Sequence, residues 1–536
     1  MRIMTKALFA LRMAPVSLLV FLAAFPLAGA PASQPILAPT PPMGWASWNH
    51  YFCDYTDQTI RDQADALVST GMRDLGYKYV IIQECLTTGR NAGGSLILDA
   101  KRFPHGMKDL VDYIHARGLK AGIYTDIGPN TCAGKPYQGS YRHEDQDART
   151  FAEWGFDFVE MDYCNRPKGE TGRAIYERMA EAIRKTGRPM LLYICSWGNE
   201  SPWTWAQGKA QLWRTEGDIS GEKNHVDWED VVTNFESNAR HAVFNAPDSW
   251  NDPDMMEVGN PGLTPAEAQT HVSMWAISAA PLWAGTDLTR MDAAIRALYT
   301  NAEVIAVDQD PLGAGPVRVR DYGAGIEVWA KPLAASGSGA QAVMLVNLGA
   351  ATAEARVEWT DLSLGGFVAV RDLWTHKDLG AFRDGYALRL PSHASALLKV
   401  TGAFDWSRGA TYEAEWPGNT RTGAAALRPC PECSQGYAVS LRGAGNAEVA
   451  SSLTFRHIVV PETGKYMAHL VYVYSGEGRH AVQVRVNRGA ALAIKLPGAI
   501  YATAQIPVEL EKGENSISLS VAGAETVTID RLRLTR

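Results

Sequence analysis

The chain has 536 residues, 46% of them hydrophobic, and this length predicts two to four domains rather than a single core. The formal net charge at pH 7 is -7, and the sequence contains no basic run. A nucleic-acid-binding protein needs a concentrated positive surface, so we exclude that class and expect no nucleic-acid partner.

The first thirty residues have the layout of a secretory signal peptide. Three basic residues precede an apolar stretch over residues 13–27, and small residues follow up to Ala30. We expect cleavage after Ala30, which assigns residues 1–30 to the signal and makes the mature protein secreted or periplasmic. An uncleaved membrane anchor is the alternative, but the apolar stretch is shorter than the ~20 residues that span a bilayer, so no membrane attachment is expected.

Between residue 43 and about residue 300, short β-rich runs alternate with amphipathic helical segments. Helices are predicted at residues 60–75 and 106–118, the second of which ends at a glycine after basic residues. Eight such units close a (β/α)8 barrel in roughly 250 residues, so we predict a barrel domain over residues 31–308. The predicted buried strands include residues 79–85, 119–126, 156–162, 189–195 and 211–214.

The C-terminal half has a different pattern. Short strands alternate with glycine-rich turns over residues 309–402, which predicts an antiparallel β domain. A polar stretch follows, and residues 410–536 are again rich in β-forming residues, which predicts a β-sandwich.

An exported protein can form disulfides, and this chain has seven cysteines. Four lie in the first half, Cys195 is left over, and Cys430 and Cys433 form a C-x-x-C pair. Such a pair can bind zinc, but no second pair or nearby histidine completes four ligands. We therefore predict a local disulfide between Cys430 and Cys433.

Polar residues at the ends of barrel strands line the active face of this fold. Carboxylates bind sugar hydroxyls, and aromatic faces stack on sugar rings, so a combination of the two predicts a carbohydrate site. A single carboxylate at a strand end is more often a surface residue or a helix cap. Here five predicted strands end in polar clusters, which favours a binding site. The strand-end clusters are Gln83 and Glu84, Tyr124 and Asp126, Glu160 and Asp162, Arg214 with Asp218, and Asp252 with Asp254, accompanied by Trp45, Trp48, Trp197, Trp213 and Trp250.

Six sequence blocks support the same interpretation: PPMGWASWNHYFC, DAKRFPHGMKDLVDYIHARGLKAGIYTDIG, TCAG, EMDYCN, WRTEGDI and WNDPDMMEVGNPGLT. These blocks resemble the signature blocks of glycoside hydrolase family 27, the family of α-galactosidases and α-N-acetylgalactosaminidases. The resemblance covers about residues 41–400. It implies a retaining glycoside hydrolase that cleaves terminal α-linked sugars from an oligo- or polysaccharide.

The resemblance also implies a role for each matching residue. Asp162, in EMDYCN, is the implied nucleophile, and Asp218, in RTEGD, is the implied general acid/base. The carboxyl groups of a retaining enzyme lie ~5 Å apart, and the reaction needs no metal or organic cofactor. The implied disulfides are Cys53 with Cys85 and Cys132 with Cys164, and the residues implied to hold the terminal sugar are Trp48, Tyr124, Arg214, Asp254 and Met255.

Four further candidates for sugar binding depart from the family pattern. Galactose-specific members hold the 4- and 6-hydroxyls with two adjacent aspartates, where this chain has Gln83 and Glu84. The longer glutamate would intrude on the space for C6, which favours β-L-arabinopyranose; another α-sugar such as glucose is the alternative. Ser196 stands where α-galactosidases have a glutamate and the N-acetylgalactosaminidases have serine, which would leave room for a 2-acetamido group.

The fourth departure is Glu160, which replaces the lysine usually found two residues before the nucleophile. Residues i and i+2 of a strand face the same side, so Glu160 and Asp162 would both enter the barrel. Neighbouring carboxylates raise each other's pKa, which is unfavourable for a nucleophile. We therefore expect either a compensating cation or a Glu160 side chain that turns away.

The C-terminal segment resembles carbohydrate-binding modules of family 35, through TYEAEW near its start and IDRLRL at its end. The resemblance implies a polysaccharide substrate and a structural calcium held by Glu413, Glu415 and Asp530. The alternative is that both glutamates face solvent on an edge strand.

The alternative to an enzyme is a sugar-binding protein that has lost catalysis. Both aspartates implied to be catalytic are present, which argues against it.

Overall fold

A computed structural model describes residues 36–219, 225–334, 339–443, 451–473, 480–496, 501–521 and 526–536. The predicted signal peptide therefore lies outside the described residues. Within the described part of the chain, none of the helices combines the length and the apolarity needed to cross a membrane.

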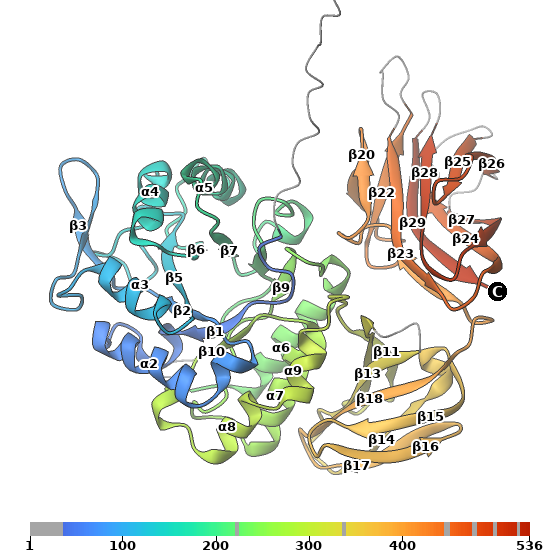
Figure 1. The fold of residues 1–536 in the computed structure, drawn as a ribbon, viewed down its shortest axis with the longest axis horizontal. Helices are drawn as coiled ribbons and strands as arrows, with labels where there is room; N and C mark the ends of the chain where they lie inside the picture. Colours follow the sequence, from blue (N-terminus) through green and yellow to red (C-terminus); the bar gives the residue numbers. More distant parts are fainter. Residues whose placement is uncertain are drawn as a thin grey trace, which may run out of the picture. The chain divides into compact units, whose positions relative to one another are not determined.

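The N-terminal domain is built around an eight-stranded parallel sheet in the order β10-β1-β2-β5-β6-β7-β8-β9 (Figure 1). A parallel bridge between Met256 and Ala284 joins the segment after β9 to β10, and the N–H of Met256 donates to the carbonyl of Trp283 at 2.7 Å. These bonds connect the two edges of the sheet, and the predicted (β/α)8 barrel is confirmed. Its strands are β1 (Met43–Ala46), β2 (Tyr79–Ile82), β5 (Lys120–Asp126), β6 (Phe158–Asp162), β7 (Leu191–Cys195), β8 (Leu212–Arg214), β9 (Trp250–Asp252) and β10 (Leu282–Ala284).

The barrel helices bury one apolar face against these strands, as Leu110 and Val111 of α3 illustrate. A short hairpin of β3 (Thr87–Arg90) and β4 (Leu96–Leu98) follows β2. The helices are α1 (Trp48–Tyr51), α2 (Asp57–Ser69), α3 (Met107–His115), α4 (Glu144–Trp154), α5 (Gly172–Thr186), α6 (Trp228–Ala239), α7 (Pro265–Ser278), α8 (Ala293–Tyr299) and α9 (Ala302–Asp308).

Two predicted elements are shorter than expected. The helix predicted over residues 60–75 ends at Ser69, because Gly71 has a φ of 84° and a 3-10 turn (Met72–Leu75) follows. The strand predicted over residues 79–85 ends at Ile82, because Glu84 and Cys85 have φ values of 55° and 54°, in the left-handed region. This second departure places Gln83 and Glu84 in a turn above the sheet.

An antiparallel domain follows the barrel and has its own hydrophobic core, which includes Val328, Leu345 and Leu398. One sheet has the order β11-β12-β13-β18-β15-β16, and β14 pairs with β17. The strands are β11 (Val317–Asp321), β12 (Ile326–Pro332), β13 (Ala340–Asn347), β14 (Ala353–Glu358), β15 (Leu364–Asp372), β16 (Lys377–Phe382), β17 (Gly385–Leu390) and β18 (Ser395–Phe404).

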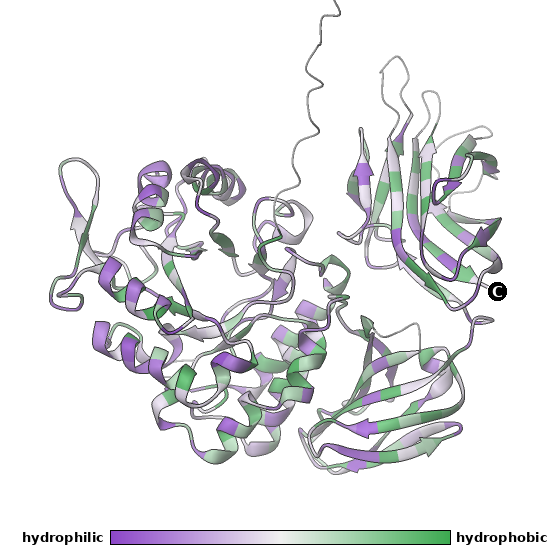
Figure 2. Cartoon of the chain, viewed as in Figure 1, coloured by the Kyte–Doolittle hydropathy of each residue, from purple (hydrophilic) through white to green (hydrophobic). Residues whose placement is uncertain are grey.

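The C-terminal segment forms two further antiparallel sheets around a separate core. One has the order β21-β22-β29-β24-β27, with β19 paired to β29, and the other has the order β20-β23-β28-β25-β26. Hydrophobic and polar residues alternate along these strands, as Figure 2 shows. The strands are β19 (Ala410–Glu413), β20 (Thr420–Thr422), β21 (Ala426–Pro429), β22 (Tyr437–Arg442), β23 (Ser452–Val460), β24 (Gly464–Val473), β25 (His480–Val486), β26 (Leu492–Leu496), β27 (Tyr501–Leu510), β28 (Gly513–Val521) and β29 (Thr526–Thr535).

Candidate active site

A cavity of about 290 Å³ lies at the carboxyl ends of the barrel strands. All eight strands contribute a residue from the strand or from the segment just after it. A cavity in this position is where barrels of this kind carry their reactive groups. Its lining includes Ala46, Trp48, Asn49, Ile81, Gln83, Glu84, Tyr124, Glu160, Asp162, Tyr193, Cys195, Trp197, Arg214, Asp218, Asp254, Met255 and Trp283.

Asp162 is the last residue of β6, and only 8% of it is exposed. Its Oδ1 accepts a hydrogen bond from the N–H of Tyr163 at 2.7 Å, and its Oδ2 accepts one from the hydroxyl of Tyr124 at 2.8 Å. Burial raises the pKa of Asp162 to about 7, although both hydrogen bonds act to lower it. The carboxylate is thus held in a single orientation and titrates near neutral pH.

Asp218 lines the same cavity from the loop after β8, but its side chain is 59% exposed. Arg214 connects this loop to the one after β9: its Nη2 lies 3.0 Å from Asp218 Oδ1, and its Nη1 lies 2.8 Å from Asp254 Oδ1. The charge of Asp218 contributes to the raised pKa of Asp162, so the two groups interact electrostatically. Of the two aspartates, Asp162 is therefore buried in the cavity and Asp218 is largely exposed to solvent.

Glu160 lines the cavity beside Asp162, as strand alternation predicted. The side chain does not turn away, and the positive charge of Arg214 lowers its pKa but does not offset the effect of burial. Its hydrogen-bond donor is an amide rather than a cation. Gln83 Nε2 donates to both carboxyl oxygens at 3.0 and 2.8 Å, and Gln83 Oε1 accepts from the N–H of Trp48 at 3.0 Å. Burial and the charge of Asp162 raise the pKa of Glu160 well above its usual value, which favours a neutral acid.

Glu84 follows Gln83 in the turn above the sheet and is 2% exposed. Its Oε1 accepts from the N–H of Ala133 at 3.1 Å, and its Oε2 is buried without a hydrogen-bond partner in the described part of the chain. Cys53 and Cys85 form a disulfide next to it, as the family resemblance implied. Glu84 therefore belongs to the wall of the cavity and is anchored to the loop after β5.

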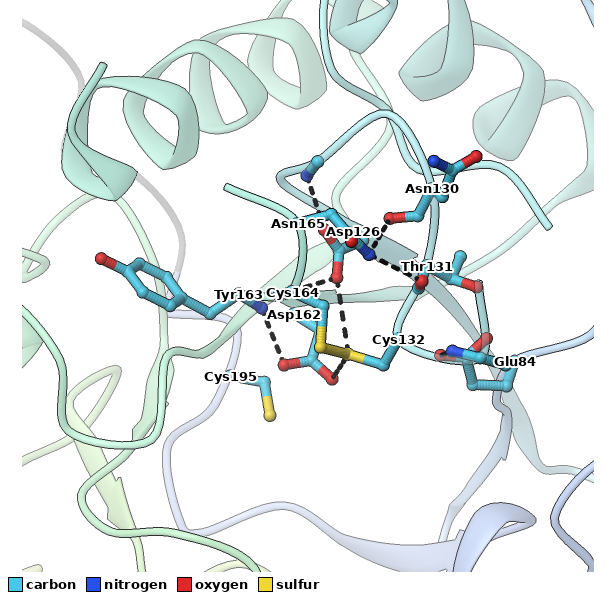
Figure 3. The surroundings of a disulfide bond; sticks show 12 residues. Glu84, Asp126, Asn130, Thr131, Cys132, Asp162, Tyr163, Cys164, Asn165 and Cys195 are labelled. Carbon is cyan, nitrogen blue, oxygen red and sulfur yellow. Dashed lines mark hydrogen bonds between the residues drawn. A yellow bond between two sulfur atoms is a disulfide. The ribbon is translucent and has the colours of Figure 1, made fainter. Parts of the chain in front are cut away.

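The second implied disulfide, between Cys132 and Cys164, is also present and lies beside Asp162 (Figure 3). The sulfur of Cys132 is 3.2 Å from Asp162 Oδ2. Asp126 lies behind the disulfide rather than in the cavity lining, and its carboxylate accepts from the N–H groups of Gly128 and Cys164. Ligand atoms of Asp126, Cys132, Asp162 and Cys164 lie within 4.8 Å of one another, but cysteines in a disulfide cannot offer thiolates to a metal.

Ser196 is not part of the cavity lining, and its hydroxyl donates to the carbonyl of Asn199 at 3.1 Å. The neighbouring Cys195 and Trp197 line the cavity instead. Cys195 is a buried free thiol whose pKa is raised well above its usual value, first by burial and then by the charge of Asp162.

Trp48 and Trp197 line the cavity, whereas the other three tryptophans expected at the rim, Trp45, Trp213 and Trp250, are fully buried in the barrel core. That expectation was wrong for these three residues, because their indoles pack inside the barrel and donate to Thr286, Asn251 and Ala38. Asp252, another predicted candidate, instead accepts hydrogen bonds from Trp283 and the N–H of Asp254 behind the cavity. Sequence reasoning also missed Asn49, Tyr193, Cys195 and Trp283 as lining residues.

The predicted calcium ligands lie in the C-terminal sandwich. The hydroxyl oxygen of Ser434 lies between two of these carboxyl groups, 2.6 Å from Glu413 Oε2 and 2.8 Å from Asp530 Oδ1. Glu415 is fully buried, and within the described ranges of the sandwich neither of its carboxyl oxygens has a hydrogen-bond partner. Burial, followed by the charge of Glu413, raises the pKa of Glu415 to about 8. Glu415 is buried, and Glu413 is half-buried with its carboxyl group against Ser434, so the alternative in which both glutamates face solvent is wrong.

A parallel barrel whose strand ends gather paired carboxyl groups and aromatic side chains around one cavity is the arrangement of a glycoside hydrolase. Comparison with known proteins specifies the family. Residues 40–310 match the model described as alpha galactosidase A, and residues 323–400 match the alpha galactosidase C-terminal beta sandwich domain. The chain therefore belongs to the α-galactosidase family, glycoside hydrolase family 27.

Individual relatives agree with this assignment. The α-galactosidase of Oryza sativa subsp. japonica is 42% identical and covers 64% of this chain and 81% of its own length. The crystal structure of α-galactosidase I from Mortierella vinacea superposes with a TM-score of 0.63 at 35% identity, over 68% of this chain and 99% of its own. A β-L-arabinopyranosidase from Geobacillus stearothermophilus, in complex with arabinose, gives a TM-score of 0.61 at 25% identity, over 68% of this chain and 98% of its own.

The second family match ends at residue 400, before the C-terminal sandwich. The resemblance of that sandwich to family 35 modules stays a prediction.

Proposed function

We propose that the protein is a secreted retaining glycoside hydrolase of α-galactosidase type, in which Asp162 is the nucleophile and Asp218 the general acid/base. The observation that carries this proposal is the asymmetry of the two aspartates: they line one cavity, one buried with a fixed orientation and the other largely exposed. Secretion is supported by the layout of the first thirty residues and by the disulfides.

The proposed reaction has two displacements. In the first, a carboxylate oxygen of Asp162 bonds to the anomeric carbon while the bond to the leaving oxygen breaks, and Asp218 gives its proton to that oxygen. In the second, Asp218 takes a proton from water, whose oxygen attacks the anomeric carbon and releases Asp162. The exposed position of Asp218 suits a group that must serve both the departing alcohol and the incoming water.

The turn after β2 supports a second candidate within the same mechanism, a β-L-arabinopyranosidase. Gln83 and Glu84 both line the cavity where galactose-specific relatives carry two aspartates. The glutamate side chain is held at the wall by the N–H of Ala133, so it occupies cavity space permanently. A sugar without C6 would leave that space to the carboxylate, and the Geobacillus relative acts on such a sugar.

The experiment that tests both candidates is a rate comparison on four nitrophenyl glycosides: α-galactoside, β-L-arabinopyranoside, α-glucoside and α-N-acetylgalactosaminide. We expect cleavage of the galactoside or the arabinopyranoside with net retention at the anomeric carbon. Asp162→Ala should abolish cleavage of the preferred substrate. Sugar binding without cleavage of any of the four would instead identify a binding protein and refute the proposal.

We also propose that Glu413, Glu415 and Asp530 hold a structural calcium ion in the C-terminal sandwich. The donor set fits a hard cation, because calcium prefers carboxylate oxygens and Glu415 offers two that are buried and unpartnered. The ion would compensate the buried charge and connect the start of the sandwich to its last strand. It would take no part in the reaction at the barrel.

A further inference from the structure

Asn49 is an asparagine in the cavity wall that has no role in the reaction described above. It lies in the short helix α1, directly after β1, and is 4% exposed. Its side chain lines the cavity together with Trp48, Met255 and the catalytic aspartates. A buried amide whose orientation is fixed presents one defined hydrogen-bonding atom to a sugar hydroxyl.

Glu257 fixes that orientation from behind the cavity. The Nδ2 of Asn49 donates to Glu257 Oε1, so the amide turns its NH2 group toward the protein interior. The other carboxyl oxygen, Oε2, accepts from Asn260 Nδ2 at 2.6 Å, and the same Nδ2 donates to the carbonyl of Gly285 at 2.9 Å. One N–H of Asn49 is thus committed to Glu257, and the carbonyl oxygen Oδ1 remains a hydrogen-bond acceptor for a ligand.

The surroundings of Glu257 prevent this arrangement from changing. Glu257 is fully buried, and its backbone N–H donates to His271 Nε2 at 3.1 Å, which makes that nitrogen an acceptor. Gly285 packs so closely that an added Cβ would lie 3.2 Å from Asn49 Cβ and 3.4 Å from Glu257 Oε1. Asn49 therefore has little room to rotate or retreat.

We propose that Asn49 is a specificity-determining residue that accepts a hydrogen bond from one hydroxyl of the bound terminal sugar, and that Glu257 is the positioning residue for its amide. The inference rests on the proposed glycosidase function and adds a recognition contact to it. It differs from the contacts of Gln83 and Glu84 because it comes from the segment after β1 and is supported by the segment after β9, whereas they lie in the turn after β2.

The test compares the wild type and Asn49→Ala on the preferred nitrophenyl glycoside and on its set of monodeoxy analogues. On the parent glycoside, we expect Asn49→Ala to lower kcat/KM by about 10-fold, the effect of one buried neutral hydrogen bond. On the one analogue that lacks the contacted hydroxyl, the variant and the wild type should have nearly equal kcat/KM. An equal loss on every analogue would overturn the inference, because it would indicate a purely structural role.

Two further variants keep the test decisive. Glu257→Asp withdraws the acceptor from Asn49 without removing Asn49, so it should show a smaller loss with the same dependence on one hydroxyl, even if Asn49→Ala fails to fold. Asn234→Ala is the matched control, since Asn234 is 3% exposed, holds the carbonyls of Gly217 and Pro253, and does not line the cavity. Its loss should be uniform across the analogues. A wild type that cleaves none of the glycosides would refute the proposed function itself.

Discussion

The hydroxyl of Tyr124 is the side-chain donor that holds the proposed nucleophile, and Tyr124→Phe removes it. In the wild type this hydroxyl donates to Asp162 Oδ2 at 2.8 Å and favours the ionised carboxylate. A hydrogen bond to a charged group contributes about 1.5–3 kcal/mol. Since about 1.4 kcal/mol corresponds to one pH unit, the pKa of Asp162 should rise from about 7 to about 8 or 9.

The sign of the effect follows from the mechanism. The nucleophile acts as a carboxylate, so kcat/KM is retained above the pKa of Asp162 and is lost as the pH falls through it. Tyr124→Phe should therefore move the acidic limb of the pH profile upward by about 1–2 units. The loss should be large at pH 6 and small at pH 9. The measurement is kcat/KM against pH on an aryl glycoside with an activated leaving group, which makes protonation by Asp218 less important.

Tyr176→Phe is the matched control, because the Tyr176 hydroxyl is buried near Asp162 but has no hydrogen-bond partner among the residues that the structure describes. Its acidic limb should stay where the wild type has it. A Tyr124→Phe profile that is lowered equally at every pH, with an unmoved limb, would refute the claim that this hydroxyl controls the ionisation of the nucleophile.

Three other predictions follow from the structure. Glu160→Gln should leave the acidic limb within about half a pH unit of the wild type, because Glu160 already holds its proton when Asp162 titrates; a larger displacement in the same assay would contradict a neutral Glu160. Calcium should raise, and EDTA lower, the thermal unfolding midpoint of the full chain, whereas Glu415→Gln should respond to neither; a variant that responds like the wild type would place the ion elsewhere. Replacing Cys132 and Cys164 by serine should lower the free energy of unfolding by about 4 kcal/mol, because this disulfide closes a loop of 32 residues. The same replacement of Cys430 and Cys433 should lower it by about 2 kcal/mol, because that loop spans 3 residues. Denaturant titration followed by fluorescence checks which disulfide stabilises the protein more.

Local patterns in the sequence were sufficient to predict the barrel. The strand expected at residues 119–126 is observed as Lys120–Asp126, and the one at residues 189–195 as Leu191–Cys195. Buried parallel strands are continuous apolar runs, so their positions can be recognised without knowing their neighbours. The turn at Glu84 could not be recognised in this way. Its left-handed backbone depends on the hydrogen bond from Ala133 to Glu84 and on the disulfide from Cys53 to Cys85, and both partners are distant in the chain.

The positions of site residues could be predicted from the sequence where they follow from the alternation of side chains along one strand. Glu160 and Asp162 share a face because they are two residues apart on β6. Ser196 was misplaced because it lies one residue past the end of β7, where the alternation places Cys195 in the cavity. The pairing of Gln83 with Glu160 joins residues 77 positions apart, one in the turn after β2 and the other on β6, and no local pattern indicates it.

That pairing has an evolutionary consequence. The Gln83 amide is oriented by the Trp48 N–H so that its NH2 group faces position 160. A lysine at 160 would meet this donor, and an aspartate at 83 would bring a second acid against Glu160. Substitutions at positions 83 and 160 should thus be inherited together. An ancestor of altered sugar preference should carry both Gln83 and Glu160, or neither of them.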